Sequence, residues 1–215
     1  MSGRRGPLRF LCWFSLLYAT MVLPWPGVGD AYRVYFSGFV RVLCSPFPEG
    51  TVTVGTWPEG RTQSGHNLDC YAALENPEKS PKKKGARWNS SETGFLPTAF
   101  TLALLLATPG SIRRRIVTAV VGILFVHLFI AVRIALPVIV IAGAPQIGIL
   151  DLSPAVRGTI RQIGNALKTP AATFFVPLLI WLAMVYARKV RTMTGNDEKT
   201  DPGRSHSAAP GLSLQ

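Results

Sequence analysis

Apolar residues occur along this chain in long uncharged blocks rather than in the short runs typical of a soluble domain. Three blocks reach or approach the length of a membrane-spanning helix: Gly94–Ile112, the stretch from Ile116 into the 130s, and Ala171–Ala187. A fourth, Phe10–Val28, follows a short basic start. Because roughly 20 apolar residues carry a helix across the ~30 Å hydrocarbon core of a bilayer, the pattern predicts four membrane-spanning helices.

The first block fits two alternatives. A basic start followed by the short uncharged run Phe10–Leu23 and small residues at 29–31 describes a cleaved signal peptide. Trp13 and Trp25 resemble the aromatic residues that mark membrane interfaces, and they favour a retained anchor. Cleavage would leave three membrane-spanning helices without changing the location of the rest.

Two shorter stretches have the three- and four-residue periodicity of amphipathic helices. In the first, residues 31–44, Asp30 is a candidate N-cap; the second opens with Ser153 and Pro154, a typical helix start. Both stretches carry basic residues off the apolar face, as helices that lie on a membrane surface do. We therefore expect both at the outer interface, the second over residues 153–169.

The remaining segments are polar. Residues 51–57, TVTVGTW, read as a short β-strand, whereas residues 58–92 contain the lysine-rich stretch NPEKSPKKKG of a solvated linker. The predicted fold is an all-α polytopic membrane protein with four transmembrane helices, outer amphipathic helices and a small β element. Its segments are an anchor or signal, an extracytoplasmic segment, a membrane domain of three spans and a disordered cytoplasmic tail: 1–28, 29–93, 94–191 and 192–215.

Composition and charge agree with this class and add an orientation. Of 215 residues, 48% are hydrophobic and 16% charged, with a net charge of +12, and the mean hydropathy is +0.27. Because cytoplasmic loops are enriched in Lys and Arg, both termini are predicted to be cytoplasmic, in what we expect to be a bacterial inner membrane. Clusters at alternate ends of the apolar blocks carry this prediction: Arg4, Arg5 and Arg9; Arg113, Arg114 and Arg115; Arg188, Lys189 and Arg191.

The same placement identifies the expected partners. Basic residues beside membrane helices face anionic lipid headgroups, and no basic stripe interleaved with aromatic residues indicates nucleic-acid binding. Cys44 and Cys70 both fall in the outer segment, where they could form a disulfide or remain free thiols. Neither has a histidine at metal-ligand spacing, so we expect no metal or other cofactor.

Two ionisable residues interrupt the third apolar block. Arg133 lies 18 residues after Arg115, about 27 Å along a helix, which puts it near the outer edge of the hydrocarbon. It could extend to the interface, or it could bind a carboxylate or polarise a carbonyl beside Pro137, where we expect the helix to kink or end. His127 lies deeper, and packing against neighbouring helices is the favoured role for it.

Residues 107–136, ATPGSIRRRIVTAVVGILFVHLFIAVRIAL, resemble the central region of the exosortase and archaeosortase family. These polytopic membrane enzymes cleave C-terminal sorting signals at the outer membrane face and transfer the protein. In the family one span begins with a cysteine, the next follows a basic loop and ends in Asn-x-x-Arg-Ile, and an outer segment carries a histidine before the last span. The resemblance covers residues 91–190 and rests on the loop 113–115, the pair Arg133-Ile134 and the order of the spans.

The chain departs from the family pattern at most of its functional positions. Residues 90–94, SSETG, stand where the cysteine is expected, and Ile130 occupies the asparagine position. The outer helix offers Asn165 and Thr169 in place of the histidine. Of the cysteine, arginine and histidine, only Arg133 carries over.

A hydroxyl nucleophile could replace the thiol only with a general base beside it. Glu92 is the nearest candidate in sequence, and His127 lies about 9 Å below Arg133 by helix rise. The candidate catalytic residues are therefore Arg133, Ser91, Thr93 and Glu92, and the candidate binding residues are Arg133, His127 and Asn165.

These departures favour a non-catalytic, exosortase-like membrane protein that is accessory in envelope protein sorting or assembly. Its partner would be a protein with a sorting tail or another membrane protein. A sorting transpeptidase with an altered nucleophile is the alternative. A small transporter component is less favoured, because beyond His127 and Arg133 the spans contain no ionisable residue that could form a relay.

Overall fold

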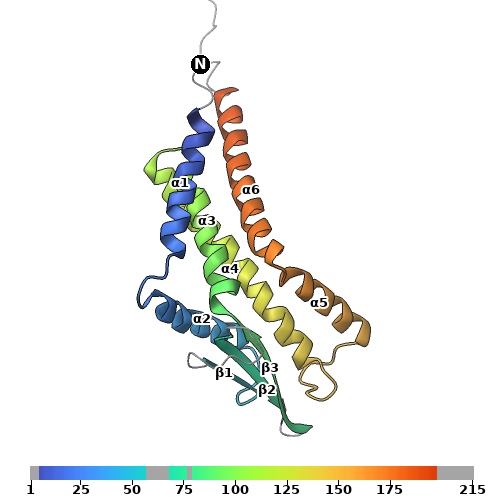
Figure 1. Ribbon diagram of the computed structural model, residues 1–215. Coiled ribbons are helices and arrows are strands. Elements are labelled where there is room, and N and C mark those ends of the chain that lie inside the picture. The colour runs from blue at the N-terminus through green and yellow to red at the C-terminus, as the bar shows by residue number, and fades with distance from the viewer. Residues whose placement is uncertain (1–4, 57–67, 77–78, 198–215) are drawn as a thin grey trace, which may run out of the picture.

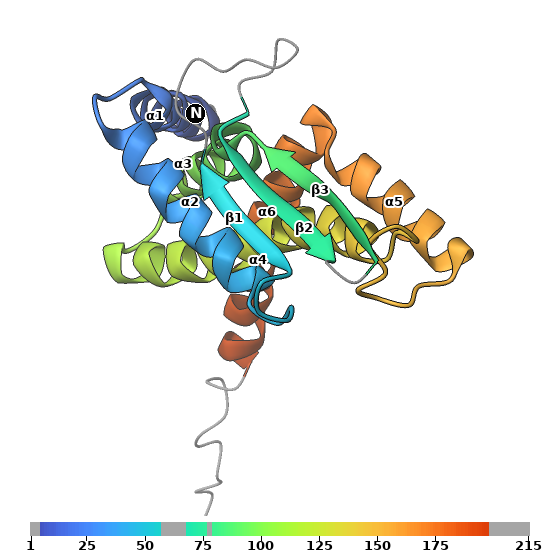
Figure 2. The same cartoon turned by 90° about the horizontal axis from the view of Figure 1, so that it is seen from below.

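A computed structural model describes residues 5–56, 68–76 and 79–197 of the chain, which form an elongated molecule (Figure 1). Four helices, α1, α3, α4 and α6, lie along the long axis, and a sheet lies at one end with α2 and α5 (Figures 1 and 2). In chain order the elements are α1 (Arg5–Val22), α2 (Val28–Cys44), β1 (Val52–Thr56), β2 (Cys70–Asn76), β3 (Ser80–Trp88), the π-helix η1 (Ser91–Phe95), α3 (Leu96–Ala107), α4 (Ile112–Ala142), α5 (Pro154–Leu167) and α6 (Pro170–Asp197).

Of the described helices, two, α4 and α6, are long and apolar enough to cross a membrane. The prediction of four membrane-spanning helices is wrong, because the other two apolar helices, Pro7–Val22 and Ser91–Ala107, have fewer than 18 residues and are too short to cross the hydrocarbon core. Proline limits both of them, since it cannot continue a helix without breaking a backbone hydrogen bond. Pro24 and Pro26 follow α1, and Pro109 follows α3.

The α4 helix extends further than its sequence suggested. It contains 31 residues and continues through Pro137 to Ala142, so of the two alternatives at Pro137, a kink or an end, the helix does not end there. Ile134, Val138 and Ala142 are buried on both sides of the proline, and this packing offsets the hydrogen bond that proline removes. α6 likewise continues to Asp197, so residues 192–197 are helical, and the rest of the predicted tail lies outside the described residues.

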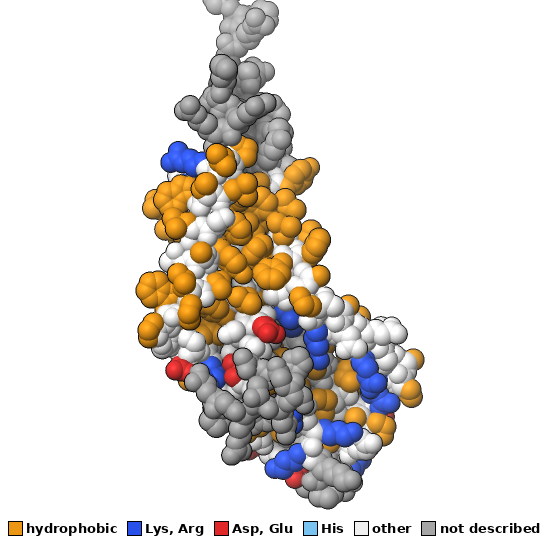
Figure 3. All heavy atoms as spheres, in the orientation of Figure 1, with side chains coloured by type: hydrophobic (Ala, Val, Ile, Leu, Met, Phe, Trp, Pro, Cys, Tyr) orange, Lys and Arg blue, Asp and Glu red, His pale blue; other side chains and the backbone are white. Residues whose placement is uncertain are grey.

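Exposed apolar side chains cover the axial helices on the face seen in Figure 3, where they are the orange spheres. After the arginines at 113–115, the large ones on α4 run from Ile116 to Val132, and those on α6 run from Phe174 to Tyr186; none is exposed from Arg133 to Ala142. The band on α4 is therefore about 24 Å long at 1.5 Å per residue, comparable with the ~30 Å hydrocarbon core of a bilayer. We call this surface the apolar belt.

The sheet contradicts the all-α prediction. Its three strands pair antiparallel in the order β1-β2-β3. The sequence predicted β1, but residues 58–92, interpreted as loop and linker, contain the whole of β2 and β3. Buried residues alternate with partly exposed ones along β2, as they do in a strand with one covered face. β3 lies at the sheet edge, where lysines are common because they discourage pairing with another chain.

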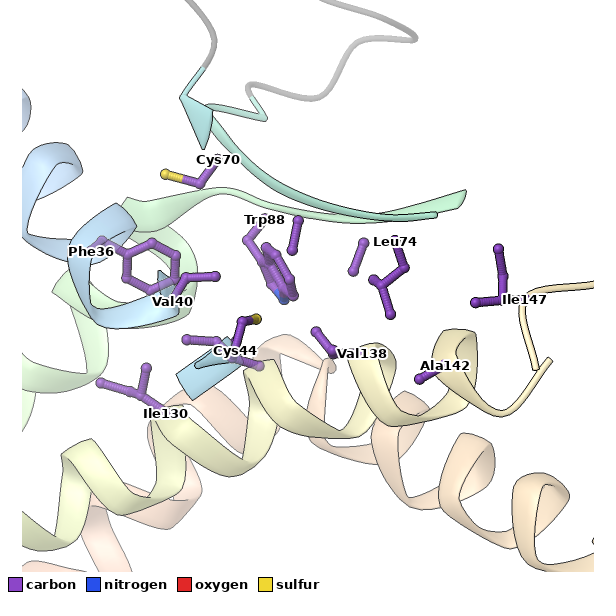
Figure 4. Packing of buried hydrophobic residues seen from close by; sticks show 13 residues of the cluster. Phe36, Val40, Cys44, Cys70, Leu74, Trp88, Ile130, Val138, Ala142 and Ile147 are labelled. Atoms are coloured by element: carbon purple, nitrogen blue, oxygen red, sulfur yellow. The ribbon is translucent and has the colours of Figure 1, made fainter. Parts of the chain in front are cut away.

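The hydrophobic core lies between one face of the sheet, α2 and α4 (Figure 4). Phe36, Val40 and Cys44 recur every fourth residue of α2 and are its buried residues. The helix is therefore amphipathic as predicted, but its apolar face packs against the sheet and α4, whereas we expected it to lie on a membrane surface. Its start differs from the prediction: Gly27, with φ 79°, is the N-cap, and Asp30 instead forms an ion pair with Arg33 in the first turn.

The second amphipathic helix, α5, begins as predicted. Ser153 is its N-cap, and its hydroxyl accepts a hydrogen bond from the N–H of Val156 at 3.4 Å. Pro154 occupies the first turn, where its missing N–H costs least. Arg157 joins α5 to the end of α4, because its Nη1 donates to the carbonyl of Gly143 at 3.0 Å.

Candidate functional site

Arg133 lies in α4 directly after the last residue of the apolar belt, and its side chain is only 6% exposed. A buried guanidinium must be paired or hydrogen-bonded, because an isolated charge away from water is very unfavourable. The residues around it therefore decide whether this position is a site or a surface cation.

Three elements meet at the guanidinium. Nη1 of Arg133 donates to the side-chain oxygen of Thr173 in α6 at 3.2 Å and points to the carbonyl oxygen of Thr93 in η1 at 3.5 Å. The ring of Phe129 lies 5.5 Å from the guanidinium carbon, which is within range of a cation–π interaction. We call Arg133, Thr93, Thr173 and Phe129 the Arg133 node.

The guanidinium keeps hydrogen-bonding capacity toward the surface. Both bonds to the threonines use Nη1, whereas an arginine has five N–H donors on three nitrogens. Among the described side chains, the only fully buried nitrogen or oxygen without a partner is Nε1 of Trp88. Nε and Nη2 of Arg133 are not in that group, so they are not completely enclosed, and no described residue uses their N–H groups.

A network of polar contacts fixes the start of η1 beside this node. Oδ1 of Asp69 accepts from the backbone N–H of Ser90 at 2.7 Å, and Oδ2 accepts from the Ser90 hydroxyl. Oδ1 of Asn89 accepts from the N–H of Glu92 at 3.1 Å. These bonds satisfy N–H groups that a helix start leaves without partners, so they hold the carbonyl of Thr93 in place.

The three candidate catalytic residues of η1, Ser91, Glu92 and Thr93, differ in their exposure to solvent. Thr93 is buried and reaches Arg133 through its backbone, whereas Ser91 and Glu92 are exposed. Glu92 is close enough to act electrostatically on Arg133. Among the described residues, no hydrogen bond joins the hydroxyl of Ser91 or Thr93 to a histidine or to Glu92.

His127 lies outside the node. Its Nδ1 is 2.8 Å from the carbonyl oxygen of Ile123, and its ring packs edge-on against the rings of Tyr35 and Phe39 of α2, with centroids 6.1 and 5.9 Å away. His127 therefore packs α4 against α2 and has its own hydrogen-bond acceptor.

Asn165 belongs to a different surface. It lines a cavity of about 340 Å³ between β3, α4 and α5, whose apolar side is formed by Leu136, Pro137, Val140, Ile141 and Ile160. Asn165 and Arg133 are therefore not parts of one site. We call this cavity the α4–α5 groove.

The basic residues expected at the inner end lie at the start of α4. Arg113 and Arg114 are exposed, and Nε of Arg115 donates to the carbonyl of Gly110 at 3.0 Å in the turn after α3. A cation is favourable at this turn because it faces the C-terminal end of α3, which is the negative end of that helix's dipole. The side chains of Arg188, Lys189 and Arg191 lie outside the described residues.

Both outer cysteines are free thiols, so the disulfide alternative is not the one adopted. Cys44 ends α2 and Cys70 begins β2, and Figure 4 shows their sulfurs apart within the core. Burial, with a smaller contribution from Asp69, raises the pKa of the Cys70 thiol to about 12, and burial raises the pKa of Cys44. Both are therefore protonated at neutral pH and are poor nucleophiles and metal ligands. Within the described part of the chain, no three His, Cys, Asp or Glu side chains gather as metal ligands would.

Comparison with known proteins leaves the site to be interpreted from its own geometry. The chain matches no family model, no curated protein and no solved structure.

The node holds a cation next to two threonines, with unused N–H donors near the surface. Such a site can bind a carboxylate or a carbonyl oxygen. Sequence analysis missed Phe129 and Thr173. Phe129 precedes Arg133 by four residues and so lies on the same helix face, a spacing that could have identified it. Thr173 is one hydroxyl in the first turn of an apolar helix, and the sequence gives no sign of the contact between α6 and α4.

Proposed function

We propose that this chain is a non-catalytic, exosortase-like membrane protein that binds the sorting tail of exported proteins and is accessory in envelope protein sorting. The observation that carries the proposal is the composition of the Arg133 node. The elements on which the family pattern carries its cysteine and its arginine meet there, together with the start of the last apolar helix. Arg133 is present, but its partners are Thr93 and Thr173.

This composition supports binding over cleavage. A thiolate or an activated hydroxyl is needed to attack a peptide carbonyl, and in the node Thr93 contributes only its backbone carbonyl to the contact. Arg133 still offers Nε and Nη2 as donors for a carboxylate or carbonyl of a bound tail. A protein with these groups can hold a tail without cutting it.

The apolar belt supports a position in the bacterial inner membrane. With α4 and α6 crossing the bilayer, Arg113, Arg114 and Arg115 lie in the cytoplasm, as the positive-inside rule favours. Phe10 of α1 stacks on Trp181 of α6 with ring centroids 5.6 Å apart, so the start of α1 and the later part of α6 lie at this same end. The sheet, α2 and α5 then face outward, where a sorting tail leaves the membrane.

The proposal is tested with the purified full-length protein and a peptide that carries a C-terminal sorting signal. We expect binding without cleavage, and we expect Arg133→Gln to weaken it at least about tenfold, as loss of one charge-assisted hydrogen bond does. Arg114→Gln, which removes an exposed charge at the other end of α4, is the matched control and should bind normally.

Two results would overturn the proposal. Absence of binding, with Arg133→Gln and the parent protein equally inactive, would remove the accessory role. A cleaved peptide detected by mass spectrometry would indicate an enzyme with an altered nucleophile, above all if Ser91→Ala or Thr93→Ala abolished the cleavage.

A further inference from the structure

The α4–α5 groove lies just beyond the apolar belt. Its floor includes Leu136, Pro137, Val140 and Ile141 of α4, and the belt on this helix ends at Val132. At 1.5 Å per residue the floor begins about 6 Å and ends about 14 Å past that limit. In the proposed orientation this is the level of the outer lipid headgroups.

The groove combines this apolar floor with a basic rim. Arg87 of β3 and Arg161 and Lys168 of α5 line it, and no Asp or Glu is among its lining residues. Arg161 and Lys168 are seven residues apart, two turns along one face of α5, so both charges face the same space. The side chain of Asn165 adds an amide between them.

Arg161 and Lys168 have no polar partner within the described part of the protein. Within the described part of the chain, neither the Arg161 nor the Lys168 side chain forms a hydrogen bond or an ion pair, and both residues are exposed. Blue side chains gather along α5 below the belt in Figure 3. An anionic group bound here would therefore meet cations that give up no internal partner.

We infer that the α4–α5 groove is a binding site for the headgroup of an anionic phospholipid. Its phosphate lies between Arg161 and Lys168, its glycerol region contacts the apolar floor, and its acyl chains continue into the lipid around the belt. A volume of about 340 Å³ is at the small end of the range for ligand sites, which suits a headgroup and not a whole lipid. Basic pockets between membrane helices bind anionic headgroups in this way.

An acidic peptide is the competing occupant, and the position of the groove favours lipid. The groove adjoins the belt, where lipid is present at far higher local concentration than any peptide. The inference rests on the proposed membrane orientation of α4 but not on tail binding, because Arg133 does not line the groove.

The test measures lipids bound to the purified full-length protein in detergent by native mass spectrometry, with phosphatidylglycerol and phosphatidylcholine of identical acyl chains. We expect phosphatidylglycerol to bind at least about tenfold more tightly. The double variant Arg161→Gln/Lys168→Gln should lose this preference, since each cation contributes about a fivefold effect. Lys83→Gln/Lys84→Gln makes the same charge change at two exposed residues of β3 that do not line the groove, and this variant should retain the preference.

The outcomes separate the alternatives. Equal binding of phosphatidylglycerol and phosphatidylcholine would overturn the inference. So would an equal loss of the preference in both double variants, because it would show that the anionic lipid is attracted by positive charge in general and not by the groove. Binding of an acidic peptide without selective binding of phosphatidylglycerol would reassign the groove to a protein partner and also overturn it. Arg133→Gln should bind phosphatidylglycerol normally, so a failure of tail binding and a failure of lipid binding are distinguishable.

Discussion

At the scale of single residues, Arg133 shows how an arginine is retained next to an apolar helix surface. The sequence placed it near the outer edge of the hydrocarbon, and the structure places it one residue past the apolar belt with 6% of its side chain exposed. Its Nη1 joins α6 and η1. The same side chain therefore joins three elements, α4, α6 and η1, and stabilises their packing.

Replacing Arg133 by methionine should destabilise the protein. The change keeps a long side chain but leaves the Thr173 hydroxyl and the Thr93 carbonyl without their donor, which costs about 1–3 kcal/mol for buried groups. Unfolding in detergent, followed by circular dichroism, measures the loss. Thr173→Val, which keeps its own volume and removes one bond, should cost about 1 kcal/mol. Arg114→Met serves as the exposed control, and an equal loss there would contradict the structural role of the node.

The buried Cys70 thiol should make the free energy of unfolding decrease with rising pH in the alkaline range. Its pKa is raised to about 12 in the folded protein by burial and by Asp69, whereas an unfolded thiol ionises near pH 8.5. The stabilisation is therefore complete below about pH 8.5 and decreases as pH rises toward 12, at up to about 1.4 kcal/mol per pH unit. Denaturant titrations between pH 7 and 11 should show a steeper decline for the parent protein than for Cys70→Ala. If the stability of the two proteins declined equally with pH, Cys70 would not be the group responsible for the decline.

At the scale of elements, local patterns predicted the amphipathic helices and missed the sheet partners. The buried face of α2 and the Ser153 cap of α5 depend on nearby residues, so they were predictable. β2 and β3 depend on pairing with one another. Lysines on β3 resembled a linker because an edge strand is solvent-exposed on one side: Lys83 pairs with Glu75 at 2.8 Å and Lys84 donates to Gln146. Such contacts are distant in sequence and leave no local signal.

The contact between α3 and α4 depends on the small size of Gly122. A Cβ atom there would lie 2.3 Å from Cδ1 of Leu105 and 3.6 Å from Cγ2 of Thr101, so the two helices approach closely. Gly122→Leu should reduce the free energy of unfolding by about 1–3 kcal/mol through overpacking. Gly158→Leu, on α5 where nothing lies within 4 Å, should be stabilising by up to about 1 kcal/mol. Thermal unfolding of both variants checks this, and a tolerated Gly122→Leu would contradict the close approach.

At the scale of the whole molecule, the sequence predicted where the apolar helices lie in the chain but not how long each one is or how many could cross a membrane. Hydropathy counts apolar residues but does not report where a helix ends. Pro24, Pro26 and Pro109 follow the ends of two helices that are shorter than expected, and α4 does not end at Pro137. The convergence at the Arg133 node was equally hidden, since Thr93 and Thr173 are each 40 residues from Arg133. The sequence could identify Arg133 as unusual but could not name its partners.

The orientation of the whole molecule is the last property that can be measured directly. If the apolar belt lies in the inner membrane as proposed, Lys83 of β3, whose side chain is 61% exposed, faces the outside. Arg114 then faces the cytoplasm beside the headgroups. Single cysteines at these two positions, in a Cys12→Ser background, report the arrangement through a maleimide that does not cross membranes. Cys44 and Cys70 are buried protonated thiols, so they should react slowly.

Lys83→Cys should be labelled in intact cells whose outer membrane alone has been permeabilised, whereas Arg114→Cys should be labelled only after the inner membrane is disrupted. The two positions lie beyond opposite ends of a belt about 24 Å long, so a single crossing of α4 predicts opposite accessibility and not a graded difference. The unsubstituted Cys12→Ser protein controls for reaction at the core thiols. Labelling of both positions in intact cells would mean that α4 does not cross the bilayer, and the reverse pattern would place the Arg133 node and the α4–α5 groove in the cytoplasm, where no exported tail could reach them.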